Sequence, residues 1–172
     1  MSTHESTSYP MMIQHDFESL PAGTQDSEWP AHVTVVPFFT VDIAKEAEAV
    51  GVIREIASTA QPIPVRPGKV SSYGLSEDIP VTELDDYTNR LHDLHNRLVQ
   101  GLGSAGCQFM DLNYALDNYS PHTTHTNRIE VPTKEFTLAS LSVVKKLPKS
   151  FAANKLIMHV FELGENQAYT FV

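Results

Sequence analysis

The sequence predicts an α+β fold built from two similar halves. Stretches in which apolar and polar residues alternate, as they do in β-strands, are interspersed with two stretches of helical spacing. A strand, a histidine-containing strand, a helix and a hairpin are followed by a helix, a strand, a second histidine-containing strand and two closing strands. With 172 residues and 41% hydrophobic content, the chain can bury one core. We therefore expect one domain over residues 10–172, with halves of about 10–80 and 81–172.

A polar segment, residues 1–9, precedes the first half, and we expect it to be a disordered leader. Met11–Phe17 alternates as a strand does, and a loop with two prolines and a glycine extends from Phe17 to Pro30. The β-branched run Ala31–Val36 predicts a second strand, which the proline after it should close. From about Asp42 to Ala60 the apolar residues recur at helical spacing.

A hairpin and a second helix are expected next. The hairpin spans Pro62–Leu75, with Pro67-Gly68 as its turn signal. Thr82 and Asp85 resemble a capping box at the start of the helix, and Gly101 lies where a C-cap glycine is expected. The remaining predicted strands are Phe109–Leu116, Glu135–Leu147 with a change of phase near Ala139-Ser140 typical of a bulge, and Lys155–Leu163.

Composition argues against several classes of function. The 12 Lys+Arg and 21 Asp+Glu residues give a net charge of −9, which opposes nonspecific binding of long nucleic acid. The single cysteine, Cys107, rules out an internal disulfide and a multi-cysteine zinc site, and we interpret it as a small buried hydrophobe. No apolar stretch approaches the roughly 20 residues of a membrane span, and the N-terminal residues lack the features of a secretion signal. We expect a cytoplasmic protein without membrane contact, and the sequence leaves its oligomeric state open.

Two His-x-Thr triplets carry the functional signal. They are His32-Val33-Thr34, within WPAHVTVVPF, and His122-Thr123-Thr124, within YSPHTTHT. Both follow a proline and lie on predicted strands, whereas a third match, His4-Glu5-Ser6, lies in the leader. The context, rather than the triplet, therefore marks the two motifs.

The spacing of the motifs suits chemistry at one phosphate. Residues two apart on a strand point to the same face, about 6 to 7 Å from each other. His32 and Thr34 would share one face, as would His122 and Thr124. Two imidazoles that titrate near neutral pH can give and take a proton, while two hydroxyls can hold phosphate oxygens. The pattern predicts in-line displacement at phosphorus.

With these motifs, the chain resembles the 2H phosphoesterase superfamily, whose members include RNA 2',3'-cyclic phosphodiesterases, also called 2'-5' RNA ligases. The resemblance covers roughly Met11 to Leu163 and includes the closing pattern FTLASLSVV and IMHVFEL. It implies a two-lobed, pseudo-symmetric fold with antiparallel sheets around a central cleft and helices outside. It also implies a metal-independent phosphodiesterase without a cofactor, which hydrolyses a cyclic phosphate or a 2'-linked phosphodiester of RNA ends or small nucleotides.

The resemblance also assigns roles to residues. His32 would be the general acid toward the leaving 2'-oxygen and His122 the general base on water, while Thr34 and Thr124 bind the phosphate. The sequence departs from the family pattern after the second motif, where His125 replaces a hydrophobic residue.

Three further residues are candidates for substrate contact. The arginine often found just after the second motif is displaced to Arg128. Tyr119 and Tyr73 could form walls on which a base stacks, although an aromatic residue at a strand end more often packs in the core.

Two alternative functions remain open at this point. One is a metal-dependent hydrolase that uses histidines such as His92, His95, His122 or His125. On an extended strand, however, His122 and His125 point to opposite faces, and we expect His92 and His95 to be solvated on the second helix. The other is a noncatalytic module that binds a nucleotide or an RNA end. The identity of the substrate cannot be read from the residues.

Overall fold

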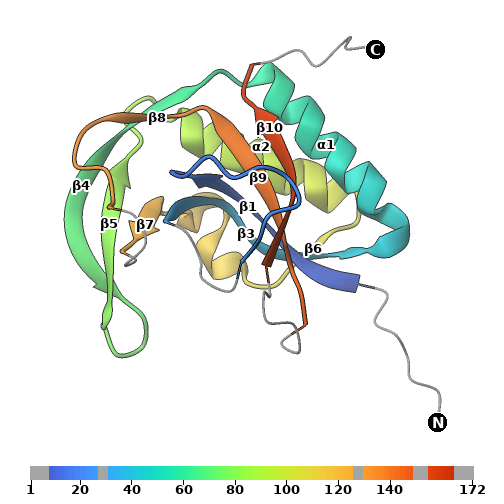
Figure 1. Ribbon diagram of the computed structural model, residues 1–172, viewed down its shortest axis with the longest axis horizontal. Helices are drawn as coiled ribbons and strands as arrows, with labels where there is room; N and C mark the ends of the chain where they lie inside the picture. The colour runs from blue at the N-terminus through green and yellow to red at the C-terminus, as the bar shows by residue number, and fades with distance from the viewer. Residues whose placement is uncertain (1–7, 27–30, 126–129, 149–154, 165–172) are drawn as a thin grey trace.

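A computed structural model describes residues 8–26, 31–125, 130–148 and 155–164 of the chain. It confirms the α+β fold class, since the described part contains antiparallel strands with two α-helices packed against them (Figure 1). None of its helices has the length and apolar character needed to cross a membrane. Arg128 and residues 1–7 of the expected leader lie outside the described residues, while Ser8 and Tyr9 already belong to the first strand.

The strands join into one sheet with the two motif strands at its centre. Along the sheet the order is β2-β10-β9-β1-β3-β7-β5-β4-β8, and β6 pairs with β3 at the side. The first motif begins β3 and the second forms β7, so motifs far apart in sequence lie on neighbouring strands. The strands are β1 (Ser8–Asp16), β2 (Gln25–Asp26), β3 (His32–Asp42), β4 (Ile63–Tyr73), β5 (Ile79–Asp85), β6 (Gln108–Phe109), β7 (His122–Thr124), β8 (Phe136–Leu138), β9 (Ser140–Lys146) and β10 (Lys155–Glu162).

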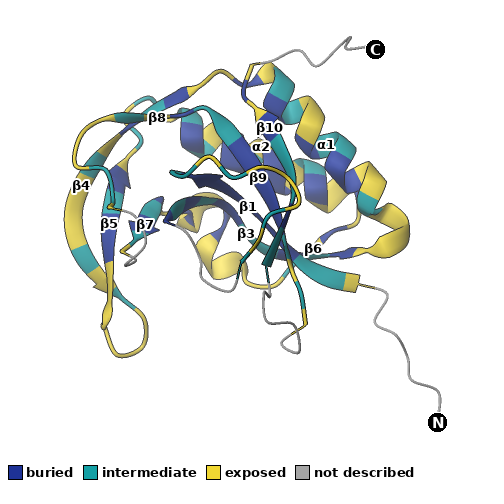
Figure 2. Ribbon diagram, in the orientation of Figure 1, coloured by how far each residue is buried: buried dark blue, intermediate teal, exposed yellow. Residues whose placement is uncertain are grey.

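Both helices pack against the same core, beside the central strands. The first, α1 (Glu46–Thr59), follows the short 3₁₀ turn η1 (Ile43–Lys45), as the helical spacing predicts, and the second is α2 (Arg90–Ser104). Their buried faces appear dark blue in Figure 2. Val33 and Val35 of β3 are fully buried in this core. Because side chains alternate along a strand, the intervening residues of β3 face away from the helices.

The predicted hairpin turn at Pro67-Gly68 is wrong. β4 continues through both residues to Tyr73, and its pairing with β5 shifts register between Pro67 and Val70. Proline has no N–H for a strand ladder, so a bulge accommodates it there without ending the strand. The chain turns instead near Gly74, whose φ of +95° is a backbone conformation that glycine adopts readily and other residues rarely do.

The start and end predicted for the second helix are also wrong. Thr82 and Asp85 belong to β5, and α2 begins at Arg90. The Asp86 carboxylate instead accepts hydrogen bonds from two backbone N–H groups in the first turn of the helix, those of Leu91 and His92. Gly101 lies inside α2, where an added Cβ would come within 2.8 Å of a Val52 methyl carbon on α1. This glycine permits close approach of the two helices rather than ending one of them.

Three strand predictions need correction as well. β3 runs past its proline to Asp42, because its pairing with β1 is irregular at this point. Only Gln108–Phe109 of the strand expected before the second motif forms, and two 3₁₀ turns follow it, η2 (Leu112–Tyr114) and η3 (Leu116–Asn118). The phase change near Ala139 is not a bulge, since β8 pairs with β4 while β9 pairs with β1 and β10.

Candidate functional site

The two His-x-Thr motifs face each other across one strand pair. Val33 of β3 lies directly opposite Thr123 of β7, and both side chains are fully buried. In an antiparallel pair this register puts His32 opposite Thr124. His32 and His122 are then diagonal neighbours, and such neighbours lie about 7 to 8 Å apart in an antiparallel pair.

All four motif side chains therefore share the face of the sheet that points away from the helices. They are half-buried, whereas Val33 and Thr123 between them are buried. Thr34 and His122 line one cavity, which supports their common direction. The arrangement therefore places two imidazoles and two hydroxyls on one face of two neighbouring strands.

The hydrogen bond that His122 makes fixes which ring nitrogen carries a proton. Its Nδ1 lies 2.9 Å from the carbonyl oxygen of Ser120. A carbonyl can only accept, so Nδ1 is the donor, and in the neutral ring Nε2 keeps a lone pair. This is the form of imidazole that accepts a proton from water.

An aromatic ring stands beside His122. The Tyr73 ring at the end of β4 lies with its centroid 4.8 Å from the His122 centroid, in an edge-on arrangement. The structure thus brings Tyr73, one of the expected substrate contacts, to the site. Tyr73 can reach the site because β4 does not turn at Pro67-Gly68 but continues as a strand to Tyr73, its last residue.

A carboxylate flanks the second motif on its outer side. Glu83 of β5 lies opposite His122 in the strand register. It accepts a hydrogen bond of 2.7 Å from the Ser71 hydroxyl and lies 3.7 Å from the Lys69 ammonium. Nothing in the sequence marks Glu83, because its proximity depends on the pairing of β5 with β7.

A buried acid flanks the first motif. In the register of β1 with β3, Asp16 lies opposite His32 and Gln14 lies opposite Thr34. Burial raises the pKa of the Asp16 carboxyl, and hydrogen bonds from the side chains of Ser142 and Gln14 act in the other direction. The sequence gives no signal for Asp16, since it ends a strand without any motif.

The motif face opens into a cavity of about 590 Å³, a volume typical of small-molecule sites. Its lining is aromatic and amide-bearing, and none of the described residues that line it is charged. His32 and Thr124 lie on the same face but outside this lining. The lining residues are Met12, Thr34, Pro37, Phe38, Tyr73, Asn113, Tyr114, Asn118, Tyr119, Ser120 and His122.

Tyr119 occupies a different position from the one expected of a stacking wall. Only 7% of the residue is exposed, and its hydroxyl donates a hydrogen bond of 2.8 Å to the Thr34 carbonyl. One face of its ring is stacked on His95, with centroids 4.0 Å apart and planes 3° apart. Burial strongly raises the pKa of its phenol. The structure therefore favours the packing role for Tyr119.

Both histidines of α2 were expected to be solvated, but only His92 is partly exposed, with 34% of its side chain accessible. His95 is fully buried, and burial lowers the pKa of its imidazole. His92 contacts Asp86, with its Nδ1 2.7 Å from the carboxylate Oδ2. The prediction failed because the segment before the second motif folds over this side of the helix, which helical spacing alone does not reveal.

His125 points away from His122, as strand alternation predicts. Its Nε2 lies 2.8 Å from the Thr82 hydroxyl, and it lines a separate cavity. Among the residues that the structure describes, no group of three or more His, Cys, Asp or Glu side chains is arranged to hold a metal ion. Cys107 is buried, as expected, and burial raises the pKa of its thiol.

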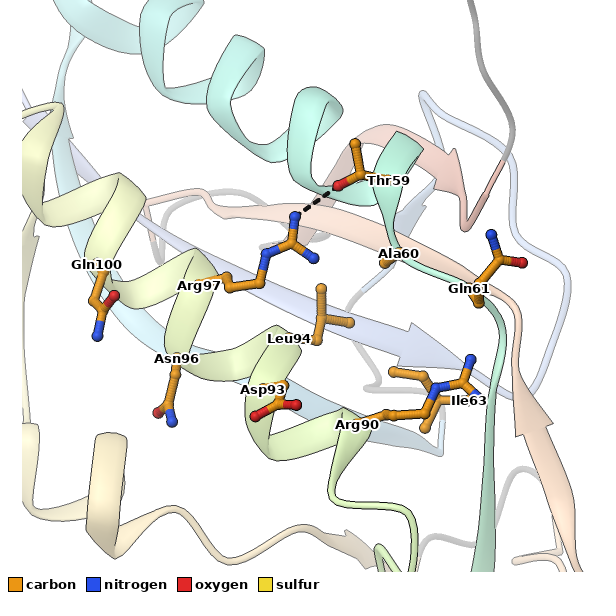
Figure 3. Close-up of a pocket in the computed structure, with 10 residues that line it drawn as sticks. All are labelled: Thr59, Ala60, Gln61, Ile63, Arg90, Asp93, Leu94, Asn96, Arg97 and Gln100. Carbon is orange, nitrogen blue, oxygen red and sulfur yellow. Dashed lines mark hydrogen bonds between the residues drawn. The ribbon is translucent and has the colours of Figure 1, made fainter.

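A second cavity of about 550 Å³ lies beside α1 and α2 (Figure 3). Its two arginines already have partners, because Arg97 donates to the Thr59 hydroxyl at 2.6 Å and Arg90 to the Pro62 carbonyl at 2.8 Å. No histidine occurs among its described lining residues. Unlike the motif face, the cavity therefore offers no imidazole for acid–base chemistry.

Comparison with known proteins agrees with this geometry. A family model of the 2'-5' RNA ligase superfamily matches residues 16–165. The structure of E. coli LigT complexed with 3'-AMP is 13% identical with a TM-score of 0.62, and the match covers 92% of this chain and 99% of LigT. The protein TT0787 of Thermus thermophilus is 12% identical with a TM-score of 0.64, over 91% of this chain and 99% of that one.

A third structure, described as a phosphoesterase, is 13% identical with a TM-score of 0.62, over 91% of this chain and 99% of its own. No curated protein sequence matches the chain. The family model spans most of the sequence, and the solved structures share the fold over nearly their whole length. The resemblance suggested by the two motifs is thereby confirmed, and this protein belongs to the 2'-5' RNA ligase superfamily.

Proposed function

We propose that the protein is a metal-independent phosphodiesterase that hydrolyses a cyclic phosphate or a 2'-linked phosphodiester of a small nucleotide or an RNA end. The observation that carries the proposal is the pairing of β3 with β7, which sets His32 and Thr34 opposite the second motif on an open face. No other described cavity combines a histidine of either motif with a threonine hydroxyl of the other.

The proposed reaction uses the two histidines in opposite protonation states. His122 takes a proton from the attacking water at Nε2, the nitrogen left free by the bond from Nδ1 to Ser120. The water oxygen forms a bond to phosphorus as the bond to the ribose oxygen breaks. His32 gives a proton to that leaving oxygen. Thr34 and Thr124 donate to the non-bridging oxygens as negative charge develops on them.

The cavity beside Thr34 and His122 suits a nucleoside. The rings of Tyr73 and Tyr114 in its lining can stack on a base, and the side-chain amides of Asn113 and Asn118 can donate to and accept from base edges. Crystals of E. coli LigT, which shares the fold, contain 3'-AMP, NADP+ or ATP. A nucleotide substrate is consistent with both observations.

Incubation with a panel of phosphodiesters tests the proposal. The panel contains a nucleoside 2',3'-cyclic phosphate, a 2'-5'-linked dinucleotide and a cyclic phosphate of ADP-ribose, each followed by ³¹P NMR with and without EDTA. We expect at least one to become a phosphomonoester at a rate that EDTA leaves unchanged. A His32→Ala, His122→Ala double variant is the blank.

The outcomes of this panel separate the three candidate functions. Activity abolished by EDTA would favour a metal-dependent hydrolase. Binding of a panel compound without any turnover would favour the noncatalytic binding module. Equal turnover by the wild type and the double variant would show that the two motifs do not catalyse the reaction.

The threonine hydroxyls should assist catalysis without being indispensable. Thr34→Val or Thr124→Val keeps the shape of the side chain and removes one donor to the phosphate. We expect kcat to fall by roughly one to three orders of magnitude, as for loss of one oxyanion donor. Thr40→Val is a matched control on β3, because the Thr40 hydroxyl contacts the Gln108 carbonyl instead, at 3.5 Å. Unchanged kinetics in both motif variants would place the phosphate elsewhere.

A further inference from the structure

The two motif strands share a buried support on the helix side of the sheet. We propose that Tyr119, held between His92 and His95 of α2, is a positioning residue that fixes the two His-x-Thr motifs relative to each other. The inference rests on the proposed function and extends it to residues that take no part in the proton transfers. We call Tyr119, His92, His95 and Asp86 the Tyr119 cluster.

The first part of the support acts on β3. The Tyr119 hydroxyl donates to the Thr34 carbonyl at 2.8 Å, and His95 Nδ1 lies 2.6 Å from the Val35 carbonyl. Both acceptors are backbone atoms of the strand that carries the first motif. The Tyr119 cluster therefore anchors the strand at Thr34, whose hydroxyl is assigned to the phosphate.

His95 also connects β3 to the segment that leads into β7. Its Nε2 accepts the backbone N–H of Leu116 at 2.8 Å, so the proton of the neutral ring is on Nδ1, which donates to Val35. Burial lowers the pKa of His95 and so favours this neutral form. A single buried ring thus joins the first motif strand to the approach of the second.

The second part of the support acts on β7. Tyr119 directly precedes Ser120, whose carbonyl accepts the Nδ1–H of His122. His92 holds the Tyr119 backbone in turn, since its Nε2 lies 3.2 Å from the Tyr119 carbonyl and its Nδ1 lies 2.7 Å from Asp86. Movement of Tyr119 would therefore displace the carbonyl that selects the tautomer of His122.

His92 contacts an acceptor at each nitrogen of its ring. These acceptors are the Tyr119 carbonyl and the Asp86 carboxylate. Asp86 is nearly inaccessible, with 1% of its side chain exposed, and it also accepts backbone N–H groups at the start of α2. The Tyr119 cluster is thereby fixed to the end of a helix, a rigid reference for both motifs.

A small displacement of such a support is costly for catalysis. Acid–base groups must be held within about 0.5 Å of productive geometry, and an error of about 1 Å can cost about 100-fold in rate. Simple core packing would need only the volume of the Tyr119 ring. The directed bonds from its hydroxyl and from the two imidazoles add a requirement for orientation.

The test removes only the hydroxyl of Tyr119. Tyr119→Phe keeps the ring and its stacking on His95 but loses the bond to the Thr34 carbonyl. We expect kcat to fall about 10-fold, with KM changed less than about threefold. Tyr87→Phe is the matched control, because the Tyr87 hydroxyl also makes one side-chain hydrogen bond, to Glu135 at 2.9 Å, away from both motifs. Its kinetics should equal those of the wild type.

Two further measurements separate positioning from plain stability. In ¹⁵N NMR of the histidine rings, His122 should be the Nδ1–H tautomer in the wild type and in Tyr87→Phe, and a mixture of tautomers in Tyr119→Phe. His95→Gln, whose amide can donate to Val35 and accept from Leu116, should keep most of kcat. His95→Leu, which can do neither, should lose it.

The inference is overturned if folded Tyr119→Phe has the kcat and the His122 tautomer of the wild type, even if its denaturation midpoint falls. It is likewise overturned if His95→Leu matches His95→Gln in kcat and in the His122 tautomer. If the wild type hydrolyses none of the panel, the proposed function fails, while the tautomer of His122 still tests the positioning.

Discussion

His122→Ala should lower kcat for a nucleoside 2',3'-cyclic phosphate by about 100-fold to 10,000-fold, the range typical of a lost general base. The variant has no group at this position to take a proton from water. Stability should change little, because the half-buried His122 side chain has only Tyr73 and the Ser120 carbonyl as described partners. The measurement is the initial rate of ring opening on the substrate that the wild type prefers.

His159→Ala is the control for this experiment. His159 lies on β10, which carries neither motif, and its ring is stacked on that of Phe161. Its removal should leave kcat unchanged. A rate for His122→Ala within threefold of the wild type would mean that another base serves the reaction, and the proposed role of His122 would be wrong.

The parts of the fold that local pattern determines were predicted well. Alternation and helical spacing indicated β1, α1 and β10 with ends shifted by a few residues, since their burial follows from periodicity alone. The motif pair was found for the same reason, because a residue and its second neighbour on a strand must share a face. No knowledge of the partner strand is needed for that step.

The predictions that were wrong share a physical cause. The structure of each of these segments depends on the segment that packs or pairs with it. Pro67 and Gly68 signal a turn in isolation, but β5 pairs with β4 from Arg66 to Tyr73, on both sides of these residues, and the irregularity becomes a bulge. Asp16 and Glu83 flank the motifs only through strand register. Helical spacing predicts a solvated His95, whereas the segment before β7 buries this residue. Such neighbours are set by long-range contacts that no local window contains.

The charge of the protein bears on which substrates the site can accept. A net charge of −9 repels polyanions, and the described lining of the cavity contains neither lysine nor arginine. Under the proposed function, binding at the motif face would depend on hydroxyl and imidazole donors, which suffice for one phosphodiester, and on stacking in the aromatic cavity. Both features favour a small nucleotide over a long RNA chain.

The roles of the two histidines can be separated by the leaving group. His32→Ala should lose nearly all turnover of the cyclic phosphate, because the departing ribose alkoxide requires a proton. It should keep much of its activity on an aryl phosphodiester, whose leaving group is already a stable anion. His122→Ala should be defective on both substrates. Rescue of His122→Ala by the aryl ester, and not of His32→Ala, would reverse the assignment.

The pH dependence gives an independent check of the same assignment. With the cyclic phosphate, the wild-type rate should rise with pH as the base loses its proton and fall again as the acid loses its own, with midpoints that belong to the coupled pair. With the aryl ester, the fall at high pH should disappear, since no protonated acid is needed, while the rise at low pH should remain. His32→Ala should show this one-sided profile on the aryl ester. A fall at high pH that persists in His32→Ala would come from another group and would remove His32 as the general acid.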